Sequence, residues 1–185
     1  MYTYPEYLVF EETSDIRHEY FEGTIRPMAV SPPNHSSLAA AVLAIVRQQL
    51  PRGCRAFTCN LRVRIPATGL STYPDVTVVC GSTQPAPDDR IAITNPVVLV
   101  EVTSNSTEEY DRGEKLQHYQ AIPTVQEVLI VSHREPRLTL HRRDEQRWTA
   151  EEATAGETIR LQAIGALLDV DDLYRDGLED APPRG

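Results

Sequence analysis

Apolar residues recur along the chain at two spacings, one typical of helices and the other typical of strands. Helical spacing runs from Leu38 to Leu50 and predicts a helix that ends before Pro51. Asn34, which follows a proline pair, is the expected N-cap of that helix. A shorter helix is expected over residues 5–12.

A third helix is predicted to open at Ser106, because Glu109 follows at the spacing of a capping box. It is expected to run to about residue 121. Apolar runs lie on both sides of it, so the sequence indicates a strand–helix–strand crossover, the connection that joins parallel strands.

Runs rich in β-branched residues predict strands in the centre and second half of the chain. Residues 97–102 are wholly apolar apart from one acid, as expected for a strand covered on both faces. Two segments on either side of Glu22 and Gly23 read as a hairpin, with glycine supplying the turn. The expected strands are 17–21, 24–28, 54–58, 61–65, 75–80, 97–102, 125–132, 137–142 and 146–151.

A crossover combined with hairpins gives an α/β fold, a mixed β-sheet core flanked by helices. We expect one domain over residues 1–176, followed by a flexible tail at 177–185. Residues 81–90, which are rich in proline and aspartate, are expected to form a loop.

The composition is typical of a soluble globular protein, with 41% hydrophobic and 24% charged residues. The N-terminal segment does not read as a signal peptide, and no apolar run approaches the roughly 20 residues that span a bilayer. The three cysteines, Cys54, Cys59 and Cys80, are an odd and sparse set, which favours a reducing cytoplasm over a disulfide framework. We therefore expect a cytoplasmic protein with no membrane partner.

The formal net charge of −9 bears on the choice of partner, because nucleic-acid binders usually carry a basic surface. Acidic residues outnumber basic ones by 27 to 18. Two groups of arginines partly offset the excess, and they are Arg134, Arg137, Arg142 and Arg143, and Arg47, Arg52, Arg55, Arg62 and Arg64. The charge weakens the case for DNA as a partner without excluding it.

One acid, Glu101, lies inside the most apolar predicted strand, on the same face as Leu99 and Val97. Burying a carboxylate without a partner is costly, so Glu101 requires a metal, a cation or an opening to solvent at the strand end. These alternatives stay open at this point.

Asp75 favours the metal among these alternatives. It heads another hydrophobic strand directly after Pro74, on the face of Thr77 and Val79. If the two strands are neighbours, Asp75 and Glu101 converge on one divalent cation, and such oxygen-rich sites suit Mg²⁺ or Mn²⁺. The alternative is an ordinary acid at a strand edge.

The third helix places Asp111, Lys115 and either His118 or Tyr119 on one face. One interpretation is a solvated pair between Asp111 and Lys115. The other is that this face points back over the end of the sheet, where Lys115 would stabilise charge on a phosphoryl oxygen or orient the attacking water.

Five segments in a fixed order resemble the Uma-type restriction endonucleases, a family within the PD-(D/E)xK nuclease superfamily. They are RHEYFEG at 17–23, SPPNH at 31–35, YPDVTVV at 73–79, VVLVEVTSNST at 97–107 and DRGEKLQHY at 111–119. Each segment alone is nonspecific, whereas the five in sequence are specific and cover most of residues 17–132.

The resemblance implies a restriction-endonuclease-like fold with a metal site. Asp75 and Glu101 would be catalytic and would bind Mg²⁺ or Mn²⁺ together with the backbone carbonyl of Val102. Lys115 corresponds to the catalytic lysine that this family places on the following helix. The sequence departs from the wider superfamily at Thr103, where most members have the lysine itself.

Glu19, Glu22 and His35 would each be assigned to the surface if taken singly. The resemblance makes Glu19 the upstream catalytic acid, which would hold a second ion or a water at the metal. Glu22 is the neighbouring acid, and the choice between the two stays open.

The function that the resemblance implies is hydrolysis of DNA phosphodiester bonds by a metal-dependent endonuclease, often as a homodimer. Two alternatives are a non-catalytic binding or assembly protein on a nuclease-derived fold, and a metal-dependent hydrolase of another substrate. For a DNA substrate, the expected contacts are the loop at 81–90 and the arginines near Arg62 and Arg64.

Overall fold

The helices and strands are taken from a computed structural model that describes residues 1–28, 32–145 and 147–178. The helices are α1 (Tyr4–Thr13), α2 (Pro33–Gln49), α3 (Glu108–Arg112), α4 (Glu114–Gln120) and α5 (Val170–Leu173). The strands are β1 (His18–Phe21), β2 (Thr24–Pro27), β3 (Cys54–Thr58), β4 (Val63–Ile65), β5 (Leu70–Thr72), β6 (Val76–Cys80), β7 (Pro85–Ala86), β8 (Asp89–Ile93), β9 (Val98–Val102), β10 (Glu127–Val131), β11 (Arg137–Asp144), β12 (Arg147–Thr154), β13 (Thr158–Leu161) and β14 (Ala166–Asp169).

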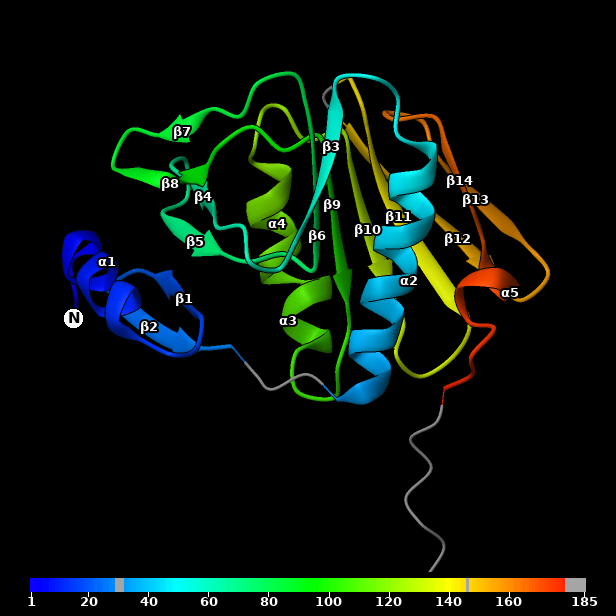
Figure 1. Ribbon diagram of the computed structural model, residues 1–185, viewed down its shortest axis with the longest axis horizontal. Helices are drawn as coiled ribbons and strands as arrows, with labels where there is room; N and C mark the ends of the chain where they lie inside the picture. Colours follow the sequence, from blue (N-terminus) through cyan, green and yellow to red (C-terminus); the bar gives the residue numbers. More distant parts are fainter. Residues whose placement is uncertain (29–31, 146, 179–185) are drawn as a thin grey trace, which may run out of the picture.

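The central sheet has the order β12-β11-β10-β9-β6-β3 (Figure 1). Strands β9 and β10 are parallel and are connected through α3 and α4, whereas the other neighbours are antiparallel. The predicted α/β fold, a mixed β-sheet core flanked by helices, is therefore confirmed, as is the strand–helix–strand crossover.

A second sheet has the order β2-β1-β5-β4-β8-β7, and β13 pairs with β14 alone. The N-terminal hairpin forms as predicted, with positive φ angles at Glu22 (46°) and Gly23 (79°). Five of the described strands, β5, β7, β8, β13 and β14, were not predicted, because each is too short to show a clear pattern. The loop expected at 81–90 is also wrong in part, since it contains β7 and the start of β8.

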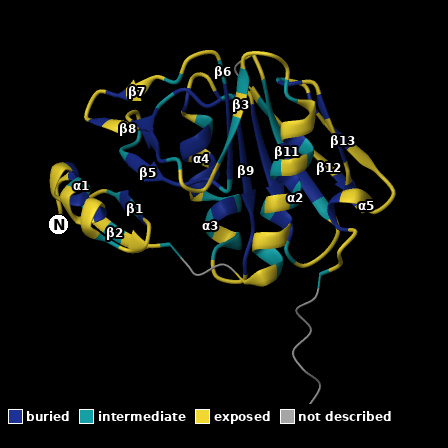
Figure 2. Cartoon of the chain, in the orientation of Figure 1, coloured by how far each residue is buried: buried dark blue, intermediate teal, exposed yellow. Residues whose placement is uncertain are grey.

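The alternation of side chains along β9 divides the interior into two cores. Val98, Val100 and Val102 face the side covered by α2, where they join a cluster that includes Leu38 and Val42. Leu99 faces the other side and joins a cluster that includes side chains of α4 and the second sheet. Both faces of the central strands are covered, as Figure 2 shows, so Glu101 enters the second core.

Two helix starts differ from the prediction. The second helix begins at Pro33 after Pro32, without a side-chain cap, so Asn34 lies inside the first turn rather than capping it. The third predicted helix is divided at Gly113 into α3 and α4, and Thr107, not Ser106, precedes α3. A Cβ atom at residue 113 would lie 2.9 Å from the carbonyl oxygen of Glu109, so the junction requires glycine.

The expected tail at 177–185 falls mostly outside the described residues. Leu178, the last of them, packs against the core. Gln146, the expected start of the last predicted strand, also lies outside them. None of the described helices is both long and apolar enough to cross a membrane.

The cysteine prediction is wrong for two of the three residues. Cys54 and Cys80 face each other in the β3–β6 ladder and form a disulfide, and Cys59 is exposed and free. The number of cysteines could not reveal this pairing, because the pairing depends on the register of the two strands that carry Cys54 and Cys80, which are 26 residues apart in the sequence. The cysteines therefore no longer favour a reducing compartment.

We predict that reducing this disulfide lowers the free energy of unfolding by about 3 to 4 kcal/mol, the chain-entropy value for a loop of this length. Urea unfolding with and without a phosphine reductant measures the loss. Cys59→Ser is the matched control and should change neither curve. Equal stability of the wild type in both conditions would contradict the prediction.

Candidate functional site

The register of β6 and β9 brings the two predicted carboxylates together. Val76 pairs with Val100, so the next positions outward, Asp75 and Glu101, lie across from each other. Directly opposed residues of antiparallel strands point to the same face. An Oδ2 atom of Asp75 also accepts a hydrogen bond of 2.8 Å from the backbone N–H of Val102, which fixes the aspartate at the end of β9.

Lys115 lies among three buried carboxylates. Its Nζ atom is 3.0 Å from Glu101 Oε1, 3.2 Å from Glu19 Oε1 and 3.6 Å from Asp111 Oδ1. All four side chains are largely buried, so this is not the solvated pair that was one interpretation of the helix face. Lys115 is also the one lysine in the 185-residue sequence.

Two hydroxyl groups fix the carboxylates around Lys115. Tyr119, one turn after Lys115 on α4, donates a short hydrogen bond to Glu101 Oε1. Thr72, at the end of β5, donates a short hydrogen bond to Glu19 Oε1. Tyr119 rather than His118 therefore shares the site with Lys115, while the ring of His118 packs against Phe21.

The cluster carries more negative charge than its cations balance. Glu101, Glu19 and Asp111 surround one ammonium group, and Asp75 acts on Glu101 and Asp111 from beside it. Burial raises the pKa of Glu101, and Asp111 and Asp75 raise it further, while Lys115 opposes them. The pKa of Asp111 is likewise raised, first by burial. The site therefore favours binding of an additional positive charge.

The same balance holds Lys115 in its charged form. Burial alone would lower its pKa, but Glu101, Tyr119, Glu19 and Asp111 together outweigh burial and raise the pKa well above its usual value. The ammonium group is thus a fixed positive charge beside Glu101.

His35, expected at the surface, instead faces Asp75. Its side chain is 13% exposed, and Nε2 lies 3.3 Å from Asp75 Oδ2. Burial works against the charged ring, but Asp75 and the backbone of Val102 outweigh it and raise the pKa of His35. The signal in the sequence was its place directly after the proline pair at the start of α2.

A small cavity of about 60 Å³ lies at the centre of the site, lined by side chains or backbone of His35, Asp75, Glu101, Val102 and Lys115. Carboxylate and carbonyl oxygens are the ligands that Mg²⁺ and Mn²⁺ take in proteins, so the donor set fits such an ion. Within the described residues, no three His, Cys, Asp or Glu side chains are grouped as a ready metal cluster. The predicted ligand set contains fewer side chains, because it consists of two carboxylates and one backbone carbonyl.

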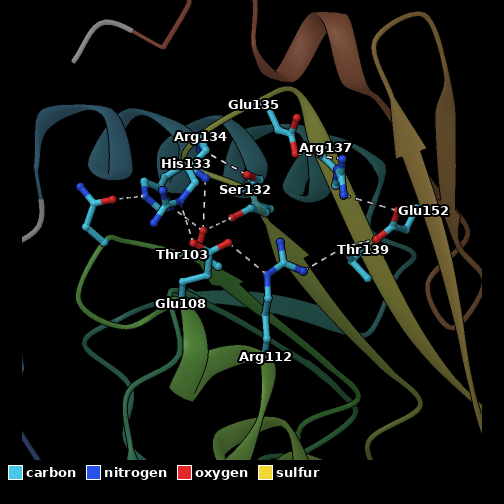
Figure 3. Close-up of polar contacts among 12 residues, drawn as sticks. Thr103, Glu108, Arg112, Ser132, His133, Arg134, Glu135, Arg137, Thr139 and Glu152 are labelled. Atoms are coloured by element: carbon cyan, nitrogen blue, oxygen red, sulfur yellow. Dashed lines mark hydrogen bonds and ion pairs between the residues drawn. The ribbon is translucent and has the colours of Figure 1, made fainter. Parts of the chain in front are cut away.

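A larger polar cavity of about 470 Å³ adjoins the first and shares His35 and Ser104 with it. Figure 3 shows His133 and Arg134 at this end of the sheet, beside Thr103 and Glu108. His133 Nδ1 is 2.7 Å from the hydroxyl of Thr103, and Arg134 Nε donates to Glu108 at 2.8 Å. Thr103, where the wider superfamily has lysine, thus orders the wall of this cavity.

The structure brings together Asp75, Glu101, Lys115 and Glu19, and their roles stay predictions. Glu19 contacts Lys115 rather than Asp75, and Glu22 is exposed at the hairpin turn. Asp111, Tyr119 and His35 also belong to the site, although none of them was predicted as a catalytic or metal-binding residue.

The expected DNA contacts at Arg62 and Arg64 are corrected by the structure. Both side chains are buried, and they pair with Asp89 at 2.9 Å and Asp88 at 3.1 Å. They hold the second sheet to its own loop, so they are not free to meet a phosphate.

The fold and the site define a class, that of restriction-endonuclease-like α/β proteins. Residues 4–171 match the model of the Uma2 family, described as "Putative restriction endonuclease". The chain belongs to this family, and the resemblance noted from its five segments is confirmed.

Two relatives match over most of their length. A protein of Synechocystis sp. PCC 6803, slr1290, is 36% identical over 175 residues, covering 92% of this chain and 90% of its own length. A second, sll1609, is 30% identical over 130 residues, covering 70% of this chain and 73% of its own. Both are called uncharacterized.

A crystal structure has the same fold. It is titled a putative nuclease belonging to DUF820 from Anabaena variabilis, and it superposes with a TM-score of 0.75 at 19% identity, covering 92% of this chain and 96% of that one. At this identity the likeness supports the fold alone.

We predict that Lys115→Met lowers the free energy of unfolding by about 3 to 5 kcal/mol, because it leaves buried carboxylates without their cation. Adding Glu101→Gln to this variant should restore part of the loss. Urea unfolding in EDTA measures both. A loss below about 1 kcal/mol, the value typical of exposed ion pairs, would contradict the buried cluster.

Proposed function

We propose that the protein is a metal-dependent nuclease that hydrolyses phosphodiester bonds of DNA at the site around Asp75 and Glu101. The observation that carries this proposal is the charge balance of the site. Three acids surround one ammonium group, Asp75 lines the small cavity beside them, and burial raises the pKa of Glu101. A divalent cation would offset this charge, and membership of the Uma2 family supports nuclease chemistry.

The residues that would hold Mg²⁺ or Mn²⁺ are Asp75, Glu101 and the backbone carbonyl of Val102. When bound, such an ion supplies Lewis acidity for attack of water on a phosphodiester. Val102 N–H would keep Asp75 aimed at the cavity, and Tyr119 would do the same for Glu101.

Lys115 would orient the attacking water or stabilise the charge that develops on the phosphoryl oxygens. Its position depends on Glu19, whose carboxylate lies 3.2 Å from Nζ and is itself held by Thr72. Glu19 would therefore act first by placing the ammonium group. The earlier alternative, that Glu19 holds a second ion, would require it to leave Lys115.

The two groups of arginines differ in how free they are to meet a nucleic acid, because Arg47, Arg52 and Arg55 are exposed. Arg142 pairs with Glu127 and Glu151, and Arg143 donates to backbone carbonyls. Cations do line the two cavities beside the site, Arg134 in one and Arg26 in the other. We propose that they contact the phosphates that flank the scissile bond, and that a homodimer would place one site on each strand of a duplex.

The proposal predicts Mn²⁺-dependent cutting that requires Asp75. Wild type, Asp75→Ala and the control Asp15→Ala, an exposed aspartate, are incubated with single-stranded and duplex DNA in Mn²⁺ or in EDTA. Wild type and the control should cut in Mn²⁺, whereas Asp75→Ala should fall to the EDTA level because a metal ligand is lost.

Equal cutting by Asp75→Ala and wild type would overturn the proposed site. If no protein cuts DNA but Mn²⁺ raises the melting temperature of wild type and not of Asp75→Ala, the metal site stands and the substrate is another phosphodiester or ester. If Mn²⁺ has no effect on either, the protein is a binding or assembly protein on a nuclease-derived fold.

A further inference from the structure

We infer that His35 is a third side-chain ligand of the ion at Asp75 and Glu101, and that its imidazole makes the site prefer Mn²⁺ to Mg²⁺. The inference rests on the proposed function, because it requires an ion at Asp75. His35 belongs to the matching segment SPPNH, in which it was assigned no role. The three side chains would have to move closer together to share an ion, because the described His, Cys, Asp and Glu residues form no ready group of three.

The imidazole ring of His35 lies beside the predicted metal ligands. His35 is the third residue of α2, and the helix start directs its side chain to the end of the central sheet. It lines the 60 Å³ cavity together with Asp75, Glu101 and Val102, the three residues expected to bind the ion. The ring and the predicted ligands therefore meet in one small space.

The donor atoms of His35 and Asp75 are spaced nearly as two ligands of one ion would be. Nε2 of His35 and Oδ2 of Asp75 are 3.3 Å apart. Neighbouring ligands of an octahedral ion at roughly 2.1 Å are separated by about 3.0 Å. The imidazole nitrogen and the carboxylate can thus share a cation after a shift of a few tenths of an ångström.

The other ring nitrogen of His35, Nδ1, distinguishes this residue from a histidine placed for structure. Within the described parts of the chain, Nδ1 of His35 is buried and has no hydrogen-bond partner. By contrast, both nitrogens of His133 are bonded, to Thr103 and to Asn105. A histidine placed for structure is normally satisfied at both nitrogens. The ring of His35 therefore contacts Asp75 through Nε2 and has no hydrogen bond that fixes it at Nδ1.

An imidazole ligand changes which metal ion the site prefers. Mg²⁺ prefers oxygen ligands and keeps several waters, whereas imidazole suits first-row transition ions. A site with two carboxylates, a carbonyl and an imidazole therefore gains more affinity for Mn²⁺ than for Mg²⁺ from its histidine.

Pulsed electron paramagnetic resonance of the Mn²⁺-loaded protein tests the contact directly. The spin-echo decay of wild type should show modulation by a coordinated ¹⁴N nucleus. The modulation should vanish in His35→Gln, whose amide can still hydrogen-bond Asp75, and persist in the control His141→Gln on β11. Absence of nitrogen modulation in wild type, or its persistence in His35→Gln, would overturn the inference.

Calorimetric titration supplies the second readout. His35→Gln and His35→Ala should lose at least about 10-fold in Mn²⁺ affinity, the lower end of what even an outer-shell partner contributes, and far less in Mg²⁺ affinity. An equal loss for both ions would make His35 a positioning residue for Asp75 and overturn its role as a ligand.

Asp75→Ala separates the two proposals. If it abolishes Mn²⁺ binding while both His35 variants bind like wild type, the inference fails and the proposed function stands. If it leaves Mn²⁺ binding intact, the metal site of the proposed function fails, and the inference fails with it.

Discussion

The constraint on which the site depends is a carboxylate inside a strand that is covered on both faces. Glu101 follows Leu99 into the core formed with α4, where an unpaired charge would be costly. Lys115 Nζ lies 3.0 Å from Glu101 and offsets the cost of burying its charge, but the ammonium group also contacts Glu19 and Asp111. Each acid that fixes the ammonium adds negative charge. The cluster is therefore stable as a unit and still short of positive charge, which is the physical basis of the proposed metal site.

The architecture around Glu101 follows from this arrangement. The antiparallel partner β6 places Asp75 opposite Glu101, and the crossover from β9 to β10 carries Lys115 and Tyr119 back over the same sheet end. Gly113 separates α3 from α4 in this crossover, and α4 packs into the core beside Leu99. The N-terminal hairpin adds Glu19 from the second sheet. Four separate segments therefore meet at one point.

Much of this could be predicted from the sequence, and the limits have physical causes. The helix from Leu38 and the β-branched run at 97–102 carry strong periodicity, so their existence and type are confirmed. Short strands such as β5 and β13 carry too few residues for a pattern. The disulfide between Cys54 and Cys80, the burial of Arg62 and Arg64, and the contact of His35 with Asp75 all depend on register or on packing between distant segments. A single acid in an apolar run was the local signal that did point to the site.

The most direct test of the central claim, that this buried cluster binds a divalent cation at Glu101, uses the one lysine of the sequence as a probe. Protein labelled with ¹³C at lysine Cε should give one resonance, that of Lys115. We predict that Mg²⁺ shifts this resonance in a saturable way, because an ion on Glu101 changes the charge beside the ammonium group. A resonance that stays unchanged at saturating Mg²⁺ and Mn²⁺ would contradict the account.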